Sequence, residues 1–179
     1  RQVEDLGIRV VTGSRLSYNP TLPAAELGHF QVETERGDQI EADIWFQCYG
    51  SRANSGYLVG TEYAHVLRKD GTIRVEPTMQ VVGHRESYAV GDVSDVPESK
   101  RADAARHQAR VVIANIASQI ENGEADVFYQ PTKEWVVVPL GPNLGAAQLL
   151  DAQGRTRIVG AEPTSEIKGI DLMVSVIRS

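Results

Sequence analysis

Cysteine is nearly absent from this sequence: Cys48 is the only one among 179 residues. A single cysteine excludes an internal disulfide, a pair of redox cysteines and a zinc site built from cysteines. The sequence also lacks an apolar run of about 18 residues, so we predict no membrane-spanning helix. Its formal net charge of −6 argues against a nucleic-acid partner, because nucleic-acid-binding proteins carry a basic surface. The spacing of the histidines predicts no metal site; they are His29, His65, His84 and His107.

Apolar residues are plentiful enough to build a folded core. They make up 41% of the chain, which argues against intrinsic disorder. The chain opens at Arg1 with a pattern typical of the end of a helix that stops at Gly7. A strand is predicted over residues 8–12. Because a natural domain rarely starts on the last turn of a helix, we expect the chain to be a piece of a longer protein.

Alternating polar and apolar residues predict two β-hairpins in the first half of the chain. The first pairs residues 30–34 with residues 40–48, and its Ile44–Phe46 run and Cys48 are expected to be buried. The second turns at Asp70-Gly71. It joins residues 66–68 to residues 73–75.

Further strands are predicted at residues 88–90, 135–138, 147–150 and 157–160. Residues 141–145 are predicted to form a hairpin loop rather than a phosphate-binding loop. The pattern of residues 170–177 fits either a helix or a strand.

The most informative segment is a short strand that ends in Gly91-Asp92 and precedes a helix predicted over about residues 98–121. Glycine has no Cβ, so a cofactor can approach its backbone. Asp92 can accept hydrogen bonds from sugar or ribityl hydroxyls, and a helix start attracts anionic groups. Alternatively, Asp92 is a turn residue that caps the next helix. The apolar residues of this helix share one face, which is predicted to be buried: Ala102, Ala105, Ala109, Val112, Ile116 and Ile120.

Two motifs in this order carry a resemblance to a known family. The first is GDQIEADIWFQCYG at residues 37–50, and the second is YAVGD at residues 88–92. Together they resemble the C-terminal part of the FAD-dependent pyridine nucleotide-disulfide oxidoreductases. Lys100 and the ending IKGIDLMVS are most similar to the branch of apoptosis-inducing-factor-like proteins and ferroptosis-suppressor NAD(P)H:quinone oxidoreductases. Tyr49 and Ala53 depart from the family, which often has threonine and proline at these positions.

The resemblance implies an α/β fold, namely a portion of a protein with two Rossmann-like domains and an α+β C-terminal segment. Residues 1–46 would be the end of the NAD(P)H-binding domain, residues 47–121 the returning half of the FAD-binding domain, and residues 122–179 the C-terminal segment. The G-x-G-x-x-G fingerprints of such proteins do not occur in this sequence. A missing N-terminal half, in the same chain or another, is therefore expected to supply them.

The resemblance also implies a flavoprotein that passes a hydride from NAD(P)H to FAD and electrons onward to a small acceptor, with a quinone favoured. It places Gly91, Asp92 and Val93 at the flavin nucleotide, Lys100 near the flavin pyrimidine edge, and Gly50 as a hinge beside the nicotinamide. The alternatives are a solvated lysine in the first helical turn and a strand-ending glycine turn. No catalytic residue is expected, because most of the chemistry belongs to the cofactor.

A second interpretation is an interaction or regulatory module derived from such an oxidoreductase. The missing fingerprints favour it, and their presence in a longer chain would favour the enzyme. For the enzyme we expect an intracellular protein, cytoplasmic or mitochondrial, with peripheral membrane association left open.

Overall fold

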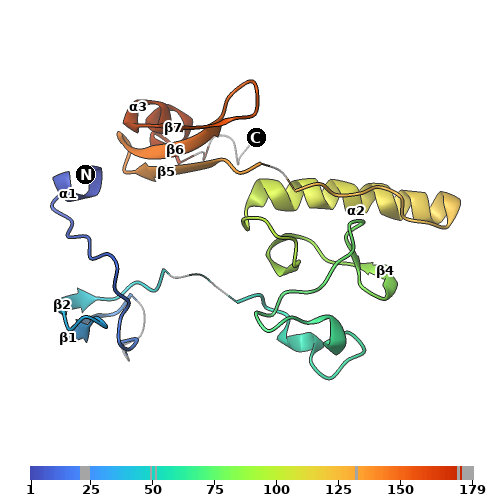
Figure 1. The fold of residues 1–179 in the computed structure, drawn as a ribbon, viewed down its shortest axis with the longest axis horizontal. Coiled ribbons are helices and arrows are strands. Elements are labelled where there is room, and N and C mark those ends of the chain that lie inside the picture. Colours follow the sequence, from blue (N-terminus) through green and yellow to red (C-terminus); the bar gives the residue numbers. More distant parts are fainter. Residues whose placement is uncertain (21–24, 49, 51, 132, 173, 175–179) are drawn as a thin grey trace. The chain divides into compact units, whose positions relative to one another are not determined.

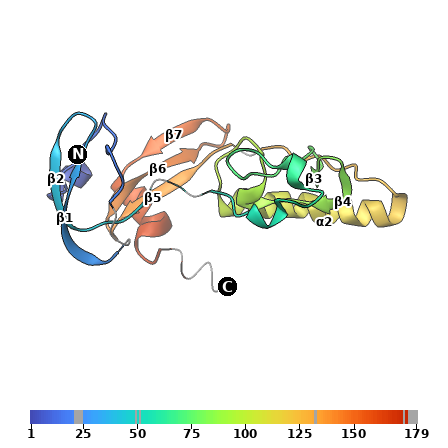
Figure 2. The ribbon, with the colours of Figure 1, turned by 90° about the horizontal axis from the view of Figure 1, so that it is seen from below.

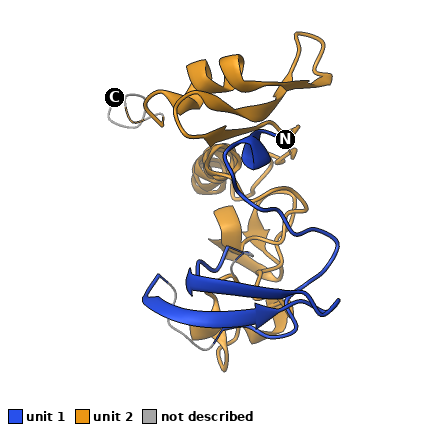
Figure 3. Cartoon of the chain, turned by 90° about the vertical axis from the view of Figure 1, so that its left-hand side faces the viewer, with its two compact units in different colours: residues 1–50 blue, residues 51–179 orange. Residues whose placement is uncertain are grey.

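The structure, a computed structural model, describes residues 1–20, 25–48, 50, 52–131, 133–172 and 174. The chain forms two compact units, residues 1–50 and residues 51–179, which are coloured blue and orange in Figure 3. Within each unit, the order of the helices and strands can be followed along the ribbon in Figures 1 and 2.

The first unit is built on one β-hairpin. Strand β1 (Leu27–Glu33) pairs antiparallel with strand β2 (Gln39–Ile44). A short helix, α1 (Gln2–Asp5), precedes the hairpin and ends before Gly7, whose φ of +76° suits glycine. The predicted helix end and the predicted hairpin are therefore confirmed.

Two other predictions for this unit are wrong. Residues 8–12 form no strand, and the second strand of the hairpin ends at Ile44 rather than at Cys48. The pairing of β1 with β2 ends where Leu27 lies opposite Ile44, after a register irregularity between Leu27 and Phe30. The strand pairing therefore does not continue beyond Ile44. Phe46 is accordingly 65% exposed, and Cys48 is an exposed free cysteine instead of a core residue.

The second unit begins with short elements around a small apolar core. These elements are η1 (Gly56–Leu58), η2 (Ala64–Val66), β3 (Gln80–Val81), β4 (His84–Tyr88) and η3 (Gly91–Val93). The centre of the core consists of Val66, Ile73, Val81 and Ala89. Because the burial of apolar side chains drives folding, this cluster fixes the loops that lead to residue 91.

The strands predicted next to this core, at residues 66–68, 73–75 and 88–90, are shorter than expected or displaced. The turn at Asp70-Gly71 is present, and Leu67 lies opposite Ile73 in a single antiparallel bridge. Val66, however, belongs to a 3₁₀ turn and not to a strand. The strand predicted at residues 88–90 is observed at His84–Tyr88, so the chain has left the strand before it reaches Gly91.

Helix α2 (Ala102–Asn122) follows, and it ends at Gly123, whose φ is +81° (Figure 1). The helix was correctly predicted, but the buried face was not. Ile116 is 43% exposed and Ile120 is 80% exposed. The buried side chains are instead Ala104, Gln108 and Asn115. The periodicity of the sequence locates the apolar face of the helix. The side-chain amides of Gln108 and Asn115, on another face, form hydrogen bonds with the neighbouring loops, so that this polar face is the one that is buried.

A three-stranded antiparallel sheet follows α2 in the chain, with its strands in the order β5-β6-β7. The strands are β5 (Val136–Leu140), β6 (Leu144–Leu150) and β7 (Thr156–Val159), so three predicted strands and the hairpin loop between the first two are confirmed. Two short helical segments, α3 (Ala161–Thr164) and η4 (Ser165–Gly169), follow them and were not predicted. Of the segment predicted at 170–177, only residues 170–172 and 174 are described.

Candidate functional site

The turn that contains Gly91 is held by hydrogen bonds to both the backbone N–H and the carbonyl oxygen of this residue. The backbone N–H of Gly91 donates a hydrogen bond to Oε1 of Gln108 over 2.6 Å. Its carbonyl oxygen accepts hydrogen bonds from Oγ and from the backbone N–H of Ser94, over 2.9 and 3.1 Å. The φ of Gly91 is +74°, a conformation that favours glycine. A Cβ at this position would lie 3.6 Å from Cβ of Ala105, so the backbone conformation, and not space, selects glycine here.

Asp92 stands on this turn with an exposed side chain. Among the described residues, its carboxylate has no hydrogen-bond or ion-pair partner. Helix α2 begins only at Ala102, and no side chain caps its first turn. The interpretation of Asp92 as a cap of the next helix is therefore wrong, because Asp92 lies well before the first residue of α2. What remains is a free carboxylate on a fixed turn, which can accept hydrogen bonds from a hydroxylated ligand.

Lys100 precedes α2 rather than lying in its first turn. Its Nζ donates hydrogen bonds to the carbonyl oxygens of Ser94, over 2.6 Å, and Val96, over 3.3 Å. The ammonium group therefore closes the loop that follows Gly91, which gives this lysine a local structural reason that the sequence did not reveal. An ammonium group has three donors, so one N–H is left for a further acceptor.

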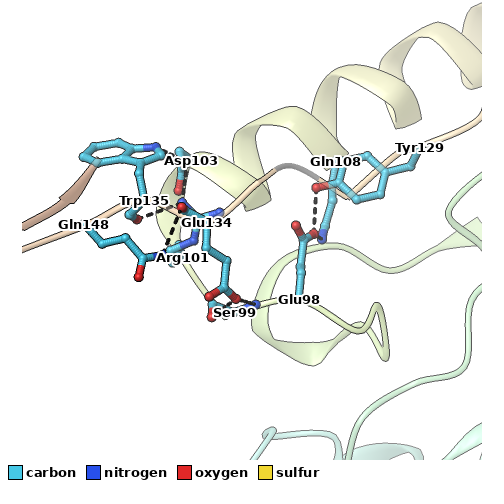
Figure 4. A network of polar contacts seen from close by, with 9 residues as sticks. All are labelled: Glu98, Ser99, Arg101, Asp103, Gln108, Tyr129, Glu134, Trp135 and Gln148. Atoms are coloured by element: carbon cyan, nitrogen blue, oxygen red, sulfur yellow. Dashed lines mark hydrogen bonds and ion pairs between the residues drawn. The ribbon is translucent and has the colours of Figure 1, made fainter. Parts of the chain in front are cut away.

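A network of polar side chains lies behind the turn, and Figure 4 shows its members. Nε2 of Gln108 donates a hydrogen bond to Oε1 of Glu98 over 2.8 Å. The hydroxyl of Tyr129 donates to the same oxygen over 2.6 Å. Burial, and then the adjacent Glu98 carboxylate, raise the pKa of Tyr129 to about 12. The phenol therefore stays protonated and donates a hydrogen bond to Glu98.

A second set of contacts ties the start of α2 to the segment that leads into β5 (Figure 4). Asp103 accepts hydrogen bonds from Arg101, over 2.8 Å, and from the indole N–H of Trp135, over 3.1 Å. The hydroxyl of Ser99 donates a hydrogen bond to Glu134. The beginning of the helix is thus anchored by the C-terminal segment of the second unit.

A cavity of about 600 Å³ lies beside this loop. Its lining combines apolar side chains with charged ones and includes Arg68, Val75, Met79, Asp95, Lys100 and Tyr129. Asp95 is held by the guanidinium of Arg68, over 2.7 and 2.6 Å, and by the backbone N–H of Val75, over 2.9 Å. The cavity therefore brings Lys100 and Tyr129 to one place.

The other predicted site residues are less informative. Val93 is half-buried against the core, and its carbonyl oxygen accepts a hydrogen bond from Ile73 over 2.7 Å. Gly50 is exposed, with a φ of +91° and open space where a Cβ would stand. Gly50 belongs to the first unit, whereas Gly91, Asp92, Val93 and Lys100 belong to the second. Tyr49, one of the two departures from the family pattern, lies outside the described residues.

The histidines differ in their surroundings. In the part of the chain that the structure describes, no group of three or more metal-binding side chains occurs. His107 is exposed on α2. His84 instead stacks on Tyr63 at a ring distance of 4.2 Å, and His65 lies beside it at 5.4 Å. This ring cluster was not predicted, because His84 is distant in sequence from Tyr63 and His65.

Gln108, Glu98 and Tyr129 are the site residues that the sequence did not reveal. Gln108 lies on the polar side of an amphipathic pattern, which usually predicts exposure, yet it is only 2% exposed. Tyr129 follows the helix in a segment without strand or helix periodicity. No sequence signal pairs these residues with Gly91, so the structure was needed to find them.

The comparison with protein families gives the class of the chain. A family model described as pyridine nucleotide-disulphide oxidoreductase matches residues 1–109, more than half of the sequence. The chain therefore belongs to the pyridine nucleotide-disulphide oxidoreductase family, and the resemblance that its motifs carry is confirmed.

The chain is similar to several curated proteins over most of its own length. It is 28% identical to FAD-dependent oxidoreductase FVFD30 of Flammulina velutipes, over 84% of this chain and 46% of that protein. It is 28% identical to ferroptosis suppressor protein 1 of Homo sapiens, over 80% of this chain and 38% of that protein. Apoptosis-inducing factor homolog B of Dictyostelium discoideum is 25% identical over 87% of this chain and 40% of its own length. The chain thus spans less than half the length of the curated relatives it matches.

Solved structures confirm the α/β fold of this family. Reduced CoADR-RHD of Bacillus anthracis matches with a TM-score of 0.57 and 22% identity, over 82% of this chain and 25% of that one. LpdA of Mycobacterium tuberculosis matches with a TM-score of 0.56 and 16% identity, over 93% of this chain and 42% of that one. Among the described residues, no helix has the length and apolar character needed to cross a membrane.

Proposed function

We propose that this chain is part of an FAD-dependent NAD(P)H oxidoreductase and that its Gly91-Asp92 turn holds the FAD. The observation that carries the proposal is the carboxylate of Asp92, which is exposed and lacks a partner among the described residues, on a turn that Gln108 and Ser94 fix. A carboxylate in this position fits a ligand that presents hydroxyl groups.

The turn and the loop that follows it fit this cofactor in three respects. Asp92 would accept hydrogen bonds from ribityl hydroxyls. Gly91 adopts the positive φ of +74° on which the shape of the turn depends, a conformation that favours glycine. Lys100 places a positive charge and one free N–H on the following loop, where they would stabilise negative charge on a ligand. When bound, the flavin supplies hydride and electron transfer, so the protein contributes orientation, charge and exclusion of water.

The finer parts of the proposal concern the domains, the electron acceptor, the N-terminal half and the location. Residues 1–46 would end an NAD(P)H-binding domain, residues 47–121 would belong to the FAD-binding domain, and residues 122–179 would form the C-terminal segment. The likeness to ferroptosis suppressor protein 1 and the motifs of that branch favour a quinone as the electron acceptor. A missing N-terminal half would supply the two glycine fingerprints. The single cysteine is compatible with a reducing intracellular compartment, cytoplasmic or mitochondrial, which we propose as the location.

The test uses the natural full-length protein and two aspartate variants. Removal of charge-assisted hydrogen bonds by Asp92→Asn should weaken FAD binding by about ten- to a hundredfold, measured by flavin fluorescence. Asp126→Asn, on an exposed loop after α2, is the matched control and should leave the affinity unchanged.

The absorption spectrum of the same protein tests the activity. We expect flavin bands that bleach when NADH or NADPH is added without oxygen and that recover when a short-chain quinone follows. A wild-type protein that stays colourless after incubation with FAD would contradict the proposal and favour a non-enzymatic interaction module.

A further inference from the structure

Helix α2 and the segment that follows it both contribute to the network behind the Gly91 turn. We propose that Gln108, Glu98 and Tyr129 are positioning residues that set the shape of this turn for cofactor binding, a role that rests on the function proposed above. Tyr129 lies beyond residues 1–109, so nothing in the family match assigns it a part in the site.

Gln108 is the link between the network and the turn. Its Oε1 accepts the N–H of Gly91, and its Nε2 donates to Glu98, so each end of the amide has a defined partner. An amide whose NH₂ faces a carboxylate cannot turn around without bringing two oxygens together. Glu98 thereby fixes which atom of Gln108 faces Gly91.

Glu98 in turn depends on Tyr129. Both Gln108 and Tyr129 donate to its Oε1, and its Oε2 is buried without a partner among the described residues. Because burial of a charged oxygen without a hydrogen bond costs free energy, the hydrogen bonds that Glu98 accepts at its other oxygen, Oε1, are needed to stabilise the carboxylate. Because the raised pKa keeps the phenol protonated at all ordinary pH values, Tyr129 is a permanent donor.

The backbone on both sides holds Tyr129 in place. Its own N–H donates to the carbonyl oxygen of Pro77 over 2.8 Å. Two residues earlier, Val127 exchanges two hydrogen bonds with the side chain of Asn115, over 2.8 and 2.7 Å. Tyr129 is 6% exposed. A continuous set of hydrogen bonds therefore runs from Tyr129, through Glu98 and Gln108, to the peptide group between Val90 and Gly91.

The experiment compares two tyrosine variants in the natural full-length protein. Tyr129→Phe removes the donor to Glu98 and keeps the ring. Tyr63→Phe removes a similar buried phenol contact, the 2.6 Å hydrogen bond to Ser87, and does not touch the network. We expect Tyr129→Phe to weaken FAD binding by about three- to tenfold and Tyr63→Phe to change it less than about twofold.

A double variant separates positioning from stability. If the network acts through the placement of Asp92, Tyr129→Phe should change the FAD affinity less than about twofold in an Asp92→Asn background. The visible circular dichroism of bound flavin should also change in Tyr129→Phe and be unchanged in Tyr63→Phe. As a rescue test, Glu98→Gln, which keeps an acceptor oxygen, should bind FAD more tightly than Glu98→Ala.

The outcomes distinguish the two proposals. Equal effects of Tyr129→Phe and Tyr63→Phe, or the same loss of affinity with and without Asp92, would overturn the positioning network alone. Equal affinity of wild type and Asp92→Asn would overturn the proposed cofactor turn and the network with it.

Discussion

Replacement of Asn115 by leucine should be among the most damaging single changes in α2. Asn115 is fully buried and binds three backbone groups, namely the carbonyl oxygens of Thr78 and Val127 and the N–H of Val127. The carbonyl of Thr78 is buried, so losing its donor costs about 1–3 kcal/mol, and each partly solvated group of Val127 adds about 0.5–1 kcal/mol. Leucine has a similar size and recovers a little apolar burial. We therefore expect a loss of about 2–4 kcal/mol in the free energy of unfolding.

The assay combines urea unfolding with amide hydrogen exchange of the segment around Val127. Exchange of the Val127 N–H should accelerate in the Asn115→Leu variant, because its acceptor is gone. Asn122→Leu, the same substitution at an exposed position of the same helix, is the control and should stay within about 0.5 kcal/mol of wild type. A loss below about 1 kcal/mol for Asn115→Leu, or unchanged exchange at Val127, would refute the argument.

Two further predictions concern the sheet and the network. Gly145→Ala should lower the free energy of unfolding, measured with urea, by about 2–4 kcal/mol, because the alanine Cβ would clash with the carbonyl oxygen of Val138 and lie 2.7 Å from Cγ2 of Thr164. Gly160→Ala, where the space for a Cβ is open, is the control, and equal stability of the two variants would contradict the reasoning. Tyr129 has its pKa raised from 10.0 to about 12 in the folded state, so its contribution to stability is complete below pH 10 and is lost as the pH rises through about 12. Urea unfolding should show this alkaline loss, and the loss should be smaller in Tyr129→Phe; an equal loss in both proteins would exclude this group as its cause.

Local patterns in the sequence predicted much of the fold. The first hairpin and the strands β5, β6 and β7 follow from alternation between turn residues, and these features depend on neighbours in the chain. The end of α2 at Gly123 follows from the left-handed conformation that glycine adopts easily. The segment 8–12 has the composition of a strand but pairs with no strand among the described residues, and a local pattern does not show whether a partner strand exists.

Of the candidate site, the sequence indicated only the central motif. Gly91 and Asp92 could be singled out because a strand, a glycine and an aspartate occur in sequence order. The hydrogen bonds of Gln108 and Lys100 depend on how the loop folds back, so their partners could not be read from spacing. The buried face of α2 was mistaken because hydrophobic periodicity ranks side chains by polarity, and here directional hydrogen bonds decide which side faces inward.

The polar inner side of α2 also has a consequence for how freely the helix can slide. Gln108, Asn115 and Gln119 face inward at intervals of seven and four residues, and each amide meets a specific backbone or side-chain partner. Apolar contacts are not directional, so a helix held by them can be repacked at a modest loss of stability. A shift of α2 by one turn, about 5.4 Å, would separate every one of these amides from its partner. These hydrogen bonds therefore favour one axial position of the helix, and they fix the distance between the Gly91 turn and the C-terminal end of α2.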